Sequence, residues 1–216
     1  MHNRMLVELE GGCRVTGLKD GTPSRDGDLL IWEHFSSKLS MRVLELRGTT
    51  TLRNEAHDEV LYVLGEERSI YLPAGEALEL AGDLTIVSAL TPQARTPAGQ
   101  PAGTPALQKT GDRWYCELIQ AEVTQFMGGI PPGRAPDHFH LYEEVICILD
   151  GEGIMHAGSS STPITSGSCI FLPRRQVHCV ENTGSGELRL LGVFYPAGSP
   201  AVRYGASSNT TAPPSR

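Results

Sequence analysis

The chain has 216 residues and a formal net charge of -7, with 39% hydrophobic and 20% charged residues. These proportions are typical of a soluble globular protein and argue against a disordered or membrane-bound one. No apolar run approaches the roughly 20 residues that a membrane-spanning helix needs. Acidic residues are spread along the chain, which argues against a surface for nucleic acid. We therefore expect neither nucleic acid nor a membrane as a partner.

The N-terminal stretch MHNRMLVELEGG has scattered charges and lacks the basic, apolar and small-residue parts of a secretion signal. The five cysteines show no zinc-ligand spacing, and their odd number leaves one unpaired in any disulfide scheme. Reduced thiols in the cytosol are the simpler interpretation. We expect a cytoplasmic protein whose cysteines have no catalytic role.

In chain order, short apolar runs rich in Val, Ile, Leu, Tyr and Phe alternate with Gly, Pro, Asn, Asp and Ser. This pattern is typical of an all-β sandwich or barrel. No helical pattern with caps extends beyond about one turn. The predicted strands are residues 29–35, 41–46, 59–64, 69–73, 84–90, 114–119, 123–130, 144–149, 153–158, 168–173, 177–182 and 188–195.

Two segments of the chain contain no predicted strand. Residues 91–107, TPQARTPAGQPAGTPAL, have no apolar periodicity and are typical of a linker or an extended crossing segment. The end of the chain, ASSNTTAPPSR, is polar and contains proline, which predicts an unfolded tail. We therefore predict a first barrel over residues 25–92, a linker over 93–108, a second barrel over 109–203 and a disordered tail over 204–216.

The two halves repeat each other. In the second half, Gly133, His138, His140, Glu144 and Val145 have the same spacing as five residues that lie 85 positions earlier, namely Gly48, Arg53, Glu55, Glu59 and Val60. Farther along, SCIFLP repeats SIYLP with an offset of 100. The larger offset indicates one additional hairpin in the second half, within GIMHAGSSSTPITSG, where the first half has a tight connection.

The strongest candidate for chemistry is the group around His138 and His140. Side chains two positions apart on a strand point to the same face, so both imidazoles can enter one barrel interior. Glu144 shares that parity if the strand continues, and His178 comes from a second strand. Imidazole and carboxylate together suit Fe, Mn, Ni, Cu or Zn. Taken alone, an HxH pair is more often solvated than bound to a metal.

The wider pattern resembles the two motifs of the cupin superfamily. The first motif, Gly, then HxH, Glu and Gly, corresponds to GRAPDHFHLYEEVICILDG, and the second corresponds to GSCIFLPRRQVHCVEN. Two departures exist: Gly133 is one residue closer to His138 than the motif asks, and Arg175 replaces a turn Gly. The second departure requires a different backbone or local strain, because glycine adopts turn conformations that other residues avoid. Neither departure changes a ligand position.

The resemblance implies a bicupin, an all-β protein of two tandem jelly-roll barrels. It also implies one divalent metal, with Fe or Mn first and Ni, Cu or Zn as alternatives, bound by His138, His140, Glu144 and His178. At the matching positions the first barrel has Arg53, Glu55, Glu59 and Leu78, and neither arginine nor leucine can ligate a cation. We expect no metal in the first barrel, and Arg53 and Glu55 could form a buried ion pair or two exposed side chains.

Three functions stay open at this point. The first is a dioxygenase, which uses vacant metal positions for a small organic substrate and oxygen. The second is a redox-neutral isomerase, aminohydrolase or decarboxylase with a Lewis-acid metal. The third is a non-catalytic module that binds a small ligand or metal. Near the second barrel, Arg134, Arg174 and Arg175 are candidates to bind an anionic substrate, or are surface charges. Open sheet edges also suggest a homodimer.

Overall fold

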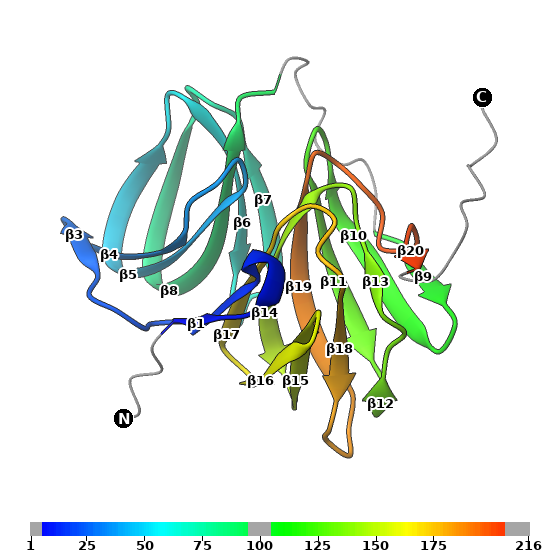
Figure 1. Cartoon of the computed structure of the whole chain (residues 1–216). Coiled ribbons are helices and arrows are strands. Elements are labelled where there is room, and N and C mark those ends of the chain that lie inside the picture. Colours follow the sequence, from blue (N-terminus) through cyan, green and yellow to red (C-terminus); the bar gives the residue numbers. More distant parts are fainter. Residues whose placement is uncertain (1–5, 95–104, 206–216) are drawn as a thin grey trace, which may run out of the picture.

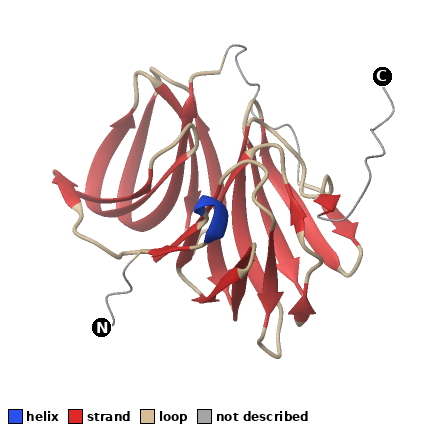
Figure 2. Cartoon of the chain, in the orientation of Figure 1, coloured by secondary structure: helices blue, strands red, loops and turns tan. Residues whose placement is uncertain are grey.

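The computed structural model describes residues 6–94 and 105–205. The predicted all-β class is confirmed: strands dominate both halves, and the one helical element in these ranges is the 3-10 turn η1 (Glu10–Gly12) (Figure 2). Within these ranges, no helix has the length and apolar character required to cross a membrane.

The first half forms one six-stranded antiparallel sheet, which lies on the left in Figure 1. Its spatial order is β3-β4-β5-β8-β6-β7. The strands are β3 (Ser24–Asp26), β4 (Leu29–Phe35), β5 (Ser40–Arg53), β6 (His57–Val63), β7 (Arg68–Leu72) and β8 (Ala77–Pro92).

The two longest strands of the first half, β5 and β8, pair along their whole length. At their middle Gly48 lies opposite Gly82, and both have positive φ, 133° and 111°. Other residues avoid this backbone region, so the glycine pair lets the two-stranded ribbon bend. The bend turns the buried Leu52 and Leu80 toward Leu44 and Leu61, and these residues belong to one aliphatic cluster.

The second half contains two sheets that face each other, as expected for a jelly roll. The larger sheet has the order β1-β2-β17-β14-β19-β11-β10-β9 and the smaller β16-β15-β18-β13-β20, with β12 paired to β18. The strands are β1 (Val7–Glu8), β2 (Arg14–Gly17), β9 (Leu107–Thr110), β10 (Arg113–Gln120), β11 (Thr124–Ile130), β12 (Gly133–Arg134), β13 (His138–Phe139), β14 (Glu143–Asp150), β15 (Glu152–Ala157), β16 (Ser160–Thr165), β17 (Ser168–Leu172), β18 (His178–Asn182), β19 (Leu188–Tyr195) and β20 (Tyr204–Gly205).

The ends of the second barrel differ from the predicted boundaries. Strand β2 pairs with β17, so the start of the chain completes the second barrel rather than the first (Figure 1). Strand β9 begins at Leu107, inside the predicted linker, and β20 includes Tyr204 and Gly205, inside the predicted tail. The rest of the tail, 206–216, and residues 95–104 of the linker lie outside the described residues.

The predicted repeat appears in the strand pairing. Glu59 lies opposite Leu72 and Leu90, and Glu144 lies opposite Leu172 and Phe194. Glu59 and Glu144 are 85 residues apart, and Leu72 and Leu172 are 100 residues apart, which are the two offsets found in the sequence. The additional hairpin of the second half is β15–β16, whereas a turn over residues 64–67 joins β6 to β7.

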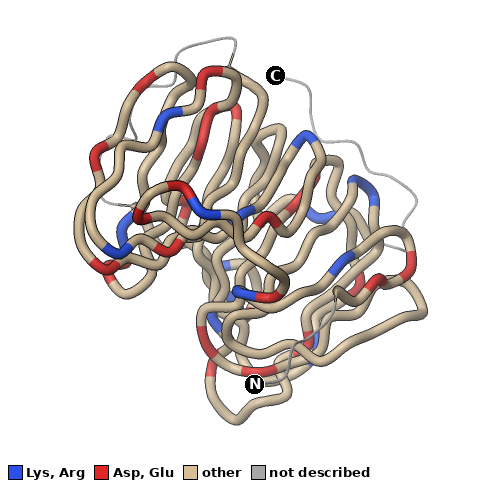
Figure 3. The backbone as a smooth tube through the Cα atoms, turned by 90° about the vertical axis from the view of Figure 1, so that its left-hand side faces the viewer, with Lys and Arg blue, Asp and Glu red and all other residues tan. Residues whose placement is uncertain are grey.

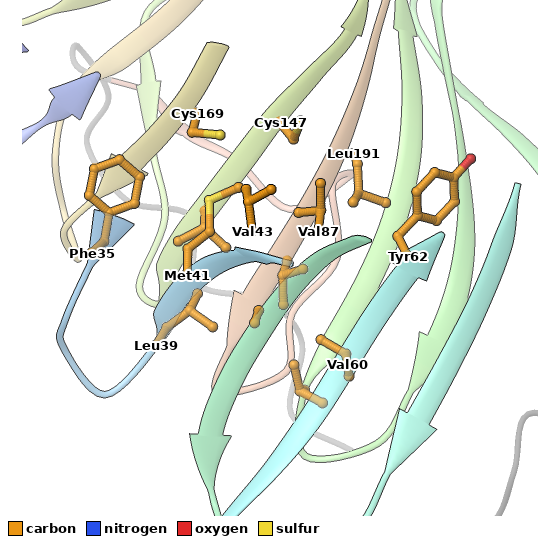
Figure 4. Packing of buried hydrophobic residues seen from close by; sticks show 14 of the residues in the cluster. Phe35, Leu39, Met41, Val43, Val60, Tyr62, Val87, Cys147, Cys169 and Leu191 are labelled. Atoms are coloured by element: carbon orange, nitrogen blue, oxygen red, sulfur yellow. The ribbon is translucent and has the colours of Figure 1, made fainter. Parts of the chain in front are cut away.

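The two barrels share a continuous apolar interface. Alternate residues of β6 and β14 face it, namely Val60 and Tyr62 on β6 and Val145 and Cys147 on β14. Figure 4 shows Val60, Tyr62 and Cys147 in this interface. The carboxylate of Glu143 adds polar contacts by accepting hydrogen bonds from Leu39 N (2.8 Å) and Ser37 Oγ (2.8 Å) of the first half. Burying many side chains of this kind stabilises an association strongly, so the two halves form one unit.

Charged residues do not gather on one part of the molecule. Lysine and arginine are interspersed with aspartate and glutamate in both halves (Figure 3).

Candidate metal centre

Four predicted ligand positions converge at one end of the second barrel. His138 lies on β13 directly opposite His178 on β18, His140 comes just after β13, and Glu144 lies on β14. The ligand nitrogens of the three histidines all lie within 4.8 Å of one another. One carboxylate oxygen, Glu144 Oε2, lies 3.8 Å from His140 Nε2 and 3.7 Å from His178 Nε2. The structure thus brings together side chains from separate strands of the barrel.

Each histidine is held by a backbone carbonyl at its Nδ1 atom. The acceptors are Pro136 O for His138 (3.0 Å), Val202 O for His140 (3.0 Å) and Gln176 O for His178 (2.8 Å). A carbonyl oxygen accepts only, so each Nδ1 carries the proton. The lone pair of each Nε2 is then free for a metal ion, which is the usual arrangement around metal-binding imidazoles.

Burial keeps the three imidazoles neutral. It lowers the pKa of His138 to about 4 and of His140 to about 3, and the neighbouring His138 lowers the pKa of His140 further. The pKa of the buried His178 is also lowered, first by burial and then by the other two histidines. Neutral imidazole is the form that binds metals, so protons compete weakly for this cluster near neutral pH.

Glu144 is the group that most needs a cation. Its residue is 4% exposed, and among the described residues its Oε2 atom has no hydrogen-bond partner. Burial raises the pKa of this carboxyl to about 8. A buried unpaired carboxylate is costly, and a nearby metal ion removes that cost. Three free imidazole nitrogens and this carboxylate therefore fit a divalent transition-metal ion.

A segment after β19 closes over the cluster. Besides the carbonyl of Val202 that holds His140, the Tyr142 hydroxyl donates to Ser199 O (2.8 Å), and Tyr204 stacks on Phe139 with ring centroids 5.4 Å apart. We call residues 197–205 the C-terminal strap. Its contacts make it part of the site rather than an appendage.

The turn before His178 accommodates the predicted departure from the motif. Arg175 has φ 63°, so it tolerates a conformation that glycine adopts more easily. Its backbone N–H donates to His140 O at 2.7 Å. In the first barrel Gly75 occupies the equivalent position, 100 residues earlier, with φ 82° and a similar bond of 2.7 Å to Asn54 O. The turn at Arg175 therefore helps to hold the backbone of His140, one of the proposed metal ligands.

A cavity of about 80 Å³ opens beside the cluster. Its walls are mainly apolar and aromatic, and two arginines on them were not predicted. It is lined by Thr110, Arg113, Trp114, Tyr115, Phe126, Gly128, Gly129, Ile130, His138, His140, Glu144, Ile146, His178, Val180, Leu190, Phe194, Pro200 and Arg203.

The arginines chosen from the sequence do not line this cavity. Arg134, Arg174 and Arg175 are exposed, and Arg134 pairs with Asp137 at 3.2 Å. Arg113 and Arg203 replace them. Arg113 comes after a turn at the start of a strand and Arg203 lies on the strap, so neither belongs to a motif that would have marked it.

In the first barrel, the position equivalent to Glu144 holds an internal ion pair. Glu59 is 1% exposed and accepts a hydrogen bond from Arg42 Nη2 at 2.7 Å and another from Ser88 Oγ. The residues that pair at the same place in the second barrel are Phe126 and Gly192. In the first barrel the guanidinium of Arg42 thus compensates the carboxylate of Glu59. The equivalent carboxylate of the second barrel, Glu144, lies beside the histidines instead.

The remaining matched positions of the first barrel do not form a cluster with Glu59. Arg53 and Glu55 form a 2.6 Å ion pair, but the side chains are 56% and 71% exposed, so the buried alternative is wrong. Leu78 packs against the aliphatic core. The pairing explains this: Arg53 lies opposite Ala77, whereas His138 lies opposite His178, a shift of one residue between the copies. Such a shift reverses which side chains face inward.

Comparison with known proteins gives three kinds of match. The family model described as Cupin domain matches residues 126–194. The oxalate-binding protein of Thermotoga maritima is 38% identical over 67 residues, which are 30% of this chain and 55% of that protein. An uncharacterized protein of Methanocaldococcus jannaschii is 33% identical over 54 residues, 25% of this chain and 43% of its own. The chain thus covers about half the length of the curated relatives it matches.

Two solved structures share the whole fold. A mutant of Bacillus subtilis oxalate decarboxylase has a TM-score of 0.63 and 13% identity, and the match covers 91% of this chain and 80% of that one. A putative glyoxylate induced protein of Pseudomonas aeruginosa has a TM-score of 0.68 and 12% identity, covering 92% and 94%. At these identities the likeness concerns the fold alone.

Proposed function

Because this chain belongs to the cupin superfamily, we propose that its second barrel holds one divalent transition-metal ion on His138, His140, Glu144 and His178 and acts on a small organic molecule. The observation that carries this proposal is the combination of three neutral imidazoles with free Nε2 atoms and a buried carboxylate oxygen without a partner among the described residues. When bound, the metal would polarise a ligand oxygen or exchange electrons with it.

Fe and Mn are the metals we favour. A donor set of imidazoles and one carboxylate suits both, and so do Ni, Cu and Zn. Bacillus subtilis oxalate decarboxylase, which shares the fold, has Mn(II) centers, and this supports a metal of the same kind here. The similarity to an oxalate-binding protein supports a small molecule as the ligand.

The leading activity is an oxidation with molecular oxygen. Isomerases, aminohydrolases and decarboxylases without oxygen need a group that takes or gives a proton at the substrate. Among the described residues that line the cavity, Glu144 is the one carboxylate, and none is a lysine or cysteine. Because Glu144 is assigned to the metal and the Tyr115 hydroxyl donates to Gln108 Oε1, chemistry carried by the metal itself is favoured over side-chain acid and base catalysis.

A binding protein without turnover is the second candidate. The small number of proton-transfer groups in the described part of the cavity supports it, since the Tyr115 hydroxyl already donates to Gln108 Oε1 (2.7 Å), and a curated relative is named for binding alone. The two candidates share the metal site, and they differ in whether the bound molecule is converted.

Elemental analysis of purified protein tests the shared part of the proposal. We expect about one metal ion per chain, and a loss of most of it in His138→Ala, because one of the four proposed ligand atoms is removed. His57→Ala, which removes an exposed histidine of the first barrel, is the matched control and should keep the metal. Equal metal content in wild type and His138→Ala would contradict the assignment.

Oxygen dependence separates the two candidates. Protein loaded with Fe(II) is incubated with a panel of small organic acids, and oxygen consumption is measured beside product formation. A dioxygenase loses turnover under anaerobic conditions. Turnover that continues without oxygen would reject the dioxygenase, and any turnover would reject the pure binding protein.

A further inference from the structure

The cavity beside the metal centre contains a buried positive charge that the fold does not neutralise. The Arg113 side chain is 12% exposed, and its Nε atom has no hydrogen-bond partner among the described residues. It pairs with Asp112 only at 4.0 Å, and the Asp112 side chain is 79% exposed. A pair at that distance with a solvated carboxylate contributes little. An ionised group placed this way needs another partner.

Arg203 brings a second positive charge to the same cavity. It lies on the C-terminal strap, where its Nε donates a hydrogen bond to the neutral Pro200 O at 3.2 Å. The carboxylates that act on its charge are those of Glu144, which is assigned to the metal, and of the exposed Asp112. Burial lowers the pKa of both arginines, and the positive charge of Arg203 lowers that of Arg113 further. The two arginines thus line one cavity, and their like charges repel each other.

We propose that Arg113 and Arg203 form an anion clamp, so that the ligand of the metal centre is a small organic acid held by its carboxylate. This inference rests on the proposed function, because the metal would bind the same molecule. A guanidinium presents two parallel donors that match a carboxylate, and such bonds are stronger than neutral ones.

The cavity also limits the size of this acid. A volume of about 80 Å³ accepts roughly five to eight water-sized groups, because each occupies about 10–15 Å³ in a cavity. The cavity walls include Ile146, Val180 and Leu190, which favour a short carbon skeleton over a fully hydrated inorganic ion. A short mono- or dicarboxylic acid fits this volume and these walls.

The position of Arg203 links binding to the strap. The neighbouring residue Val202 accepts the hydrogen bond from His140, and Tyr204 pairs with Phe139 on β13. A carboxylate between the two arginines would therefore connect β10 with the strap and cancel their repulsion. We expect occupancy of the clamp to protect the strap as well as the cavity.

Calorimetric titration of malonate into Mn(II)-loaded protein tests the clamp. Malonate is expected to bind, and Arg113→Met and Arg203→Met are each expected to weaken it by about 10- to 100-fold, the effect of one charge-assisted hydrogen-bonding partner. Arg174→Met removes an exposed arginine outside the cavity and is the matched control. The neutral diamide malonamide should bind at least about 10-fold more weakly than malonate.

The controls separate this inference from the proposed function. Metal content, measured on every variant, should stay at the wild-type level in Arg113→Met and Arg203→Met. If the wild type takes up no metal, the proposed function fails, but the clamp still predicts arginine-dependent malonate binding to the metal-free protein. Arg113→Lys and Arg203→Lys keep the charge and replace a methionine variant that does not fold.

Three results would overturn the clamp. Malonate could bind both methionine variants as tightly as wild type, malonamide could equal malonate, or inorganic phosphate could bind more tightly than malonate. The first two would show that charge recognition by these arginines is absent. The third would assign the cavity to an inorganic anion.

Discussion

The two barrels place a glutamate at the same position and compensate it differently. In the first barrel Glu59 meets the guanidinium of Arg42, and in the second Glu144 meets three neutral histidines. Arginine is permanently charged and supplies the cation from the chain itself. Neutral imidazoles supply lone pairs, and the charge must come from outside. One repeated fold thus yields a closed structural element on one side and an open site on the other.

The largest expected effect concerns the ion pair of the first barrel. Arg42→Met leaves Glu59 buried without its cation, which should lower the free energy of unfolding by about 3–5 kcal/mol. Replacing both partners, as Arg42→Met with Glu59→Leu, should recover most of that loss because no charge remains buried. Denaturant unfolding of both single variants and the double variant measures the coupling. If Arg42→Met and the double variant lost the same free energy of unfolding, the unpaired charge of Glu59 would not be the cause of the loss.

The second effect concerns pH in the metal-free second barrel. Glu144 keeps its proton up to a pKa of about 8 in the folded state, whereas an exposed carboxyl loses it near 4.5. As pH rises, the Glu144 carboxyl therefore loses its proton at a lower pH in the unfolded state than in the folded state. Between these two pKa values the free energy of unfolding falls by at most about 1.4 kcal/mol per pH unit. The three histidines act in the opposite direction, since their lowered pKa values remove stability as pH falls below about 6.5.

Thermal unfolding of chelator-treated protein from about pH 5 to 8.5 checks this prediction. Stability of the wild type should be highest near about pH 6–7 and decline on both sides. Glu144→Gln cannot ionise and should lose the decline on the alkaline side while keeping the acid side. A variant that shows the same decline as the wild type above about pH 7 would mean that Glu144 is already ionised without metal.

The smallest effect concerns the turn that differs between the copies. Arg175 has positive φ where the first barrel has Gly75. Arg175→Gly should raise stability by up to about 1 kcal/mol through relief of backbone strain, partly offset by the greater freedom of glycine in the unfolded chain. Gly75→Arg should lower it by a similar amount. A shift in the thermal midpoint with unchanged metal content is expected, and loss of metal in Arg175→Gly would assign the arginine side chain a role at the site.

Much of the fold could be predicted because its strands carry their own signal. All twelve predicted strands exist, since apolar runs bounded by Gly, Pro and Asn are visible locally. The missed strands β1 and β2 belong to the second barrel, and β2 pairs with β17, which lies far away in the sequence. Short strands at the barrel ends, such as β13 and β20, have too few residues to show alternation.

The candidate site was predictable to the same degree. His138, His140, Glu144 and His178 stand in motifs with fixed spacing, and the structure places them together. Arg113 and Arg203 have no such pattern, because they meet only when the strap folds back over the cavity.

The internal ion pair of the first barrel was missed for a similar reason. The pairing of Arg42 with Glu59 depends on strand register, and the same register turns Arg53 outward. Register is set by contacts between distant strands, so the spacing of residues within one strand does not reveal it.

Metal content of two matched variants tests the central contrast most directly. Glu144→Gln and Glu59→Gln change the same residue at the same position of the two barrels, and elemental analysis is made on each after loading with Mn(II) and removal of excess metal. We predict that Glu144→Gln loses most of the metal, while Glu59→Gln keeps about one ion per chain like the wild type. Retention of metal in Glu144→Gln together with its loss in Glu59→Gln would place the metal in the other barrel and contradict the account.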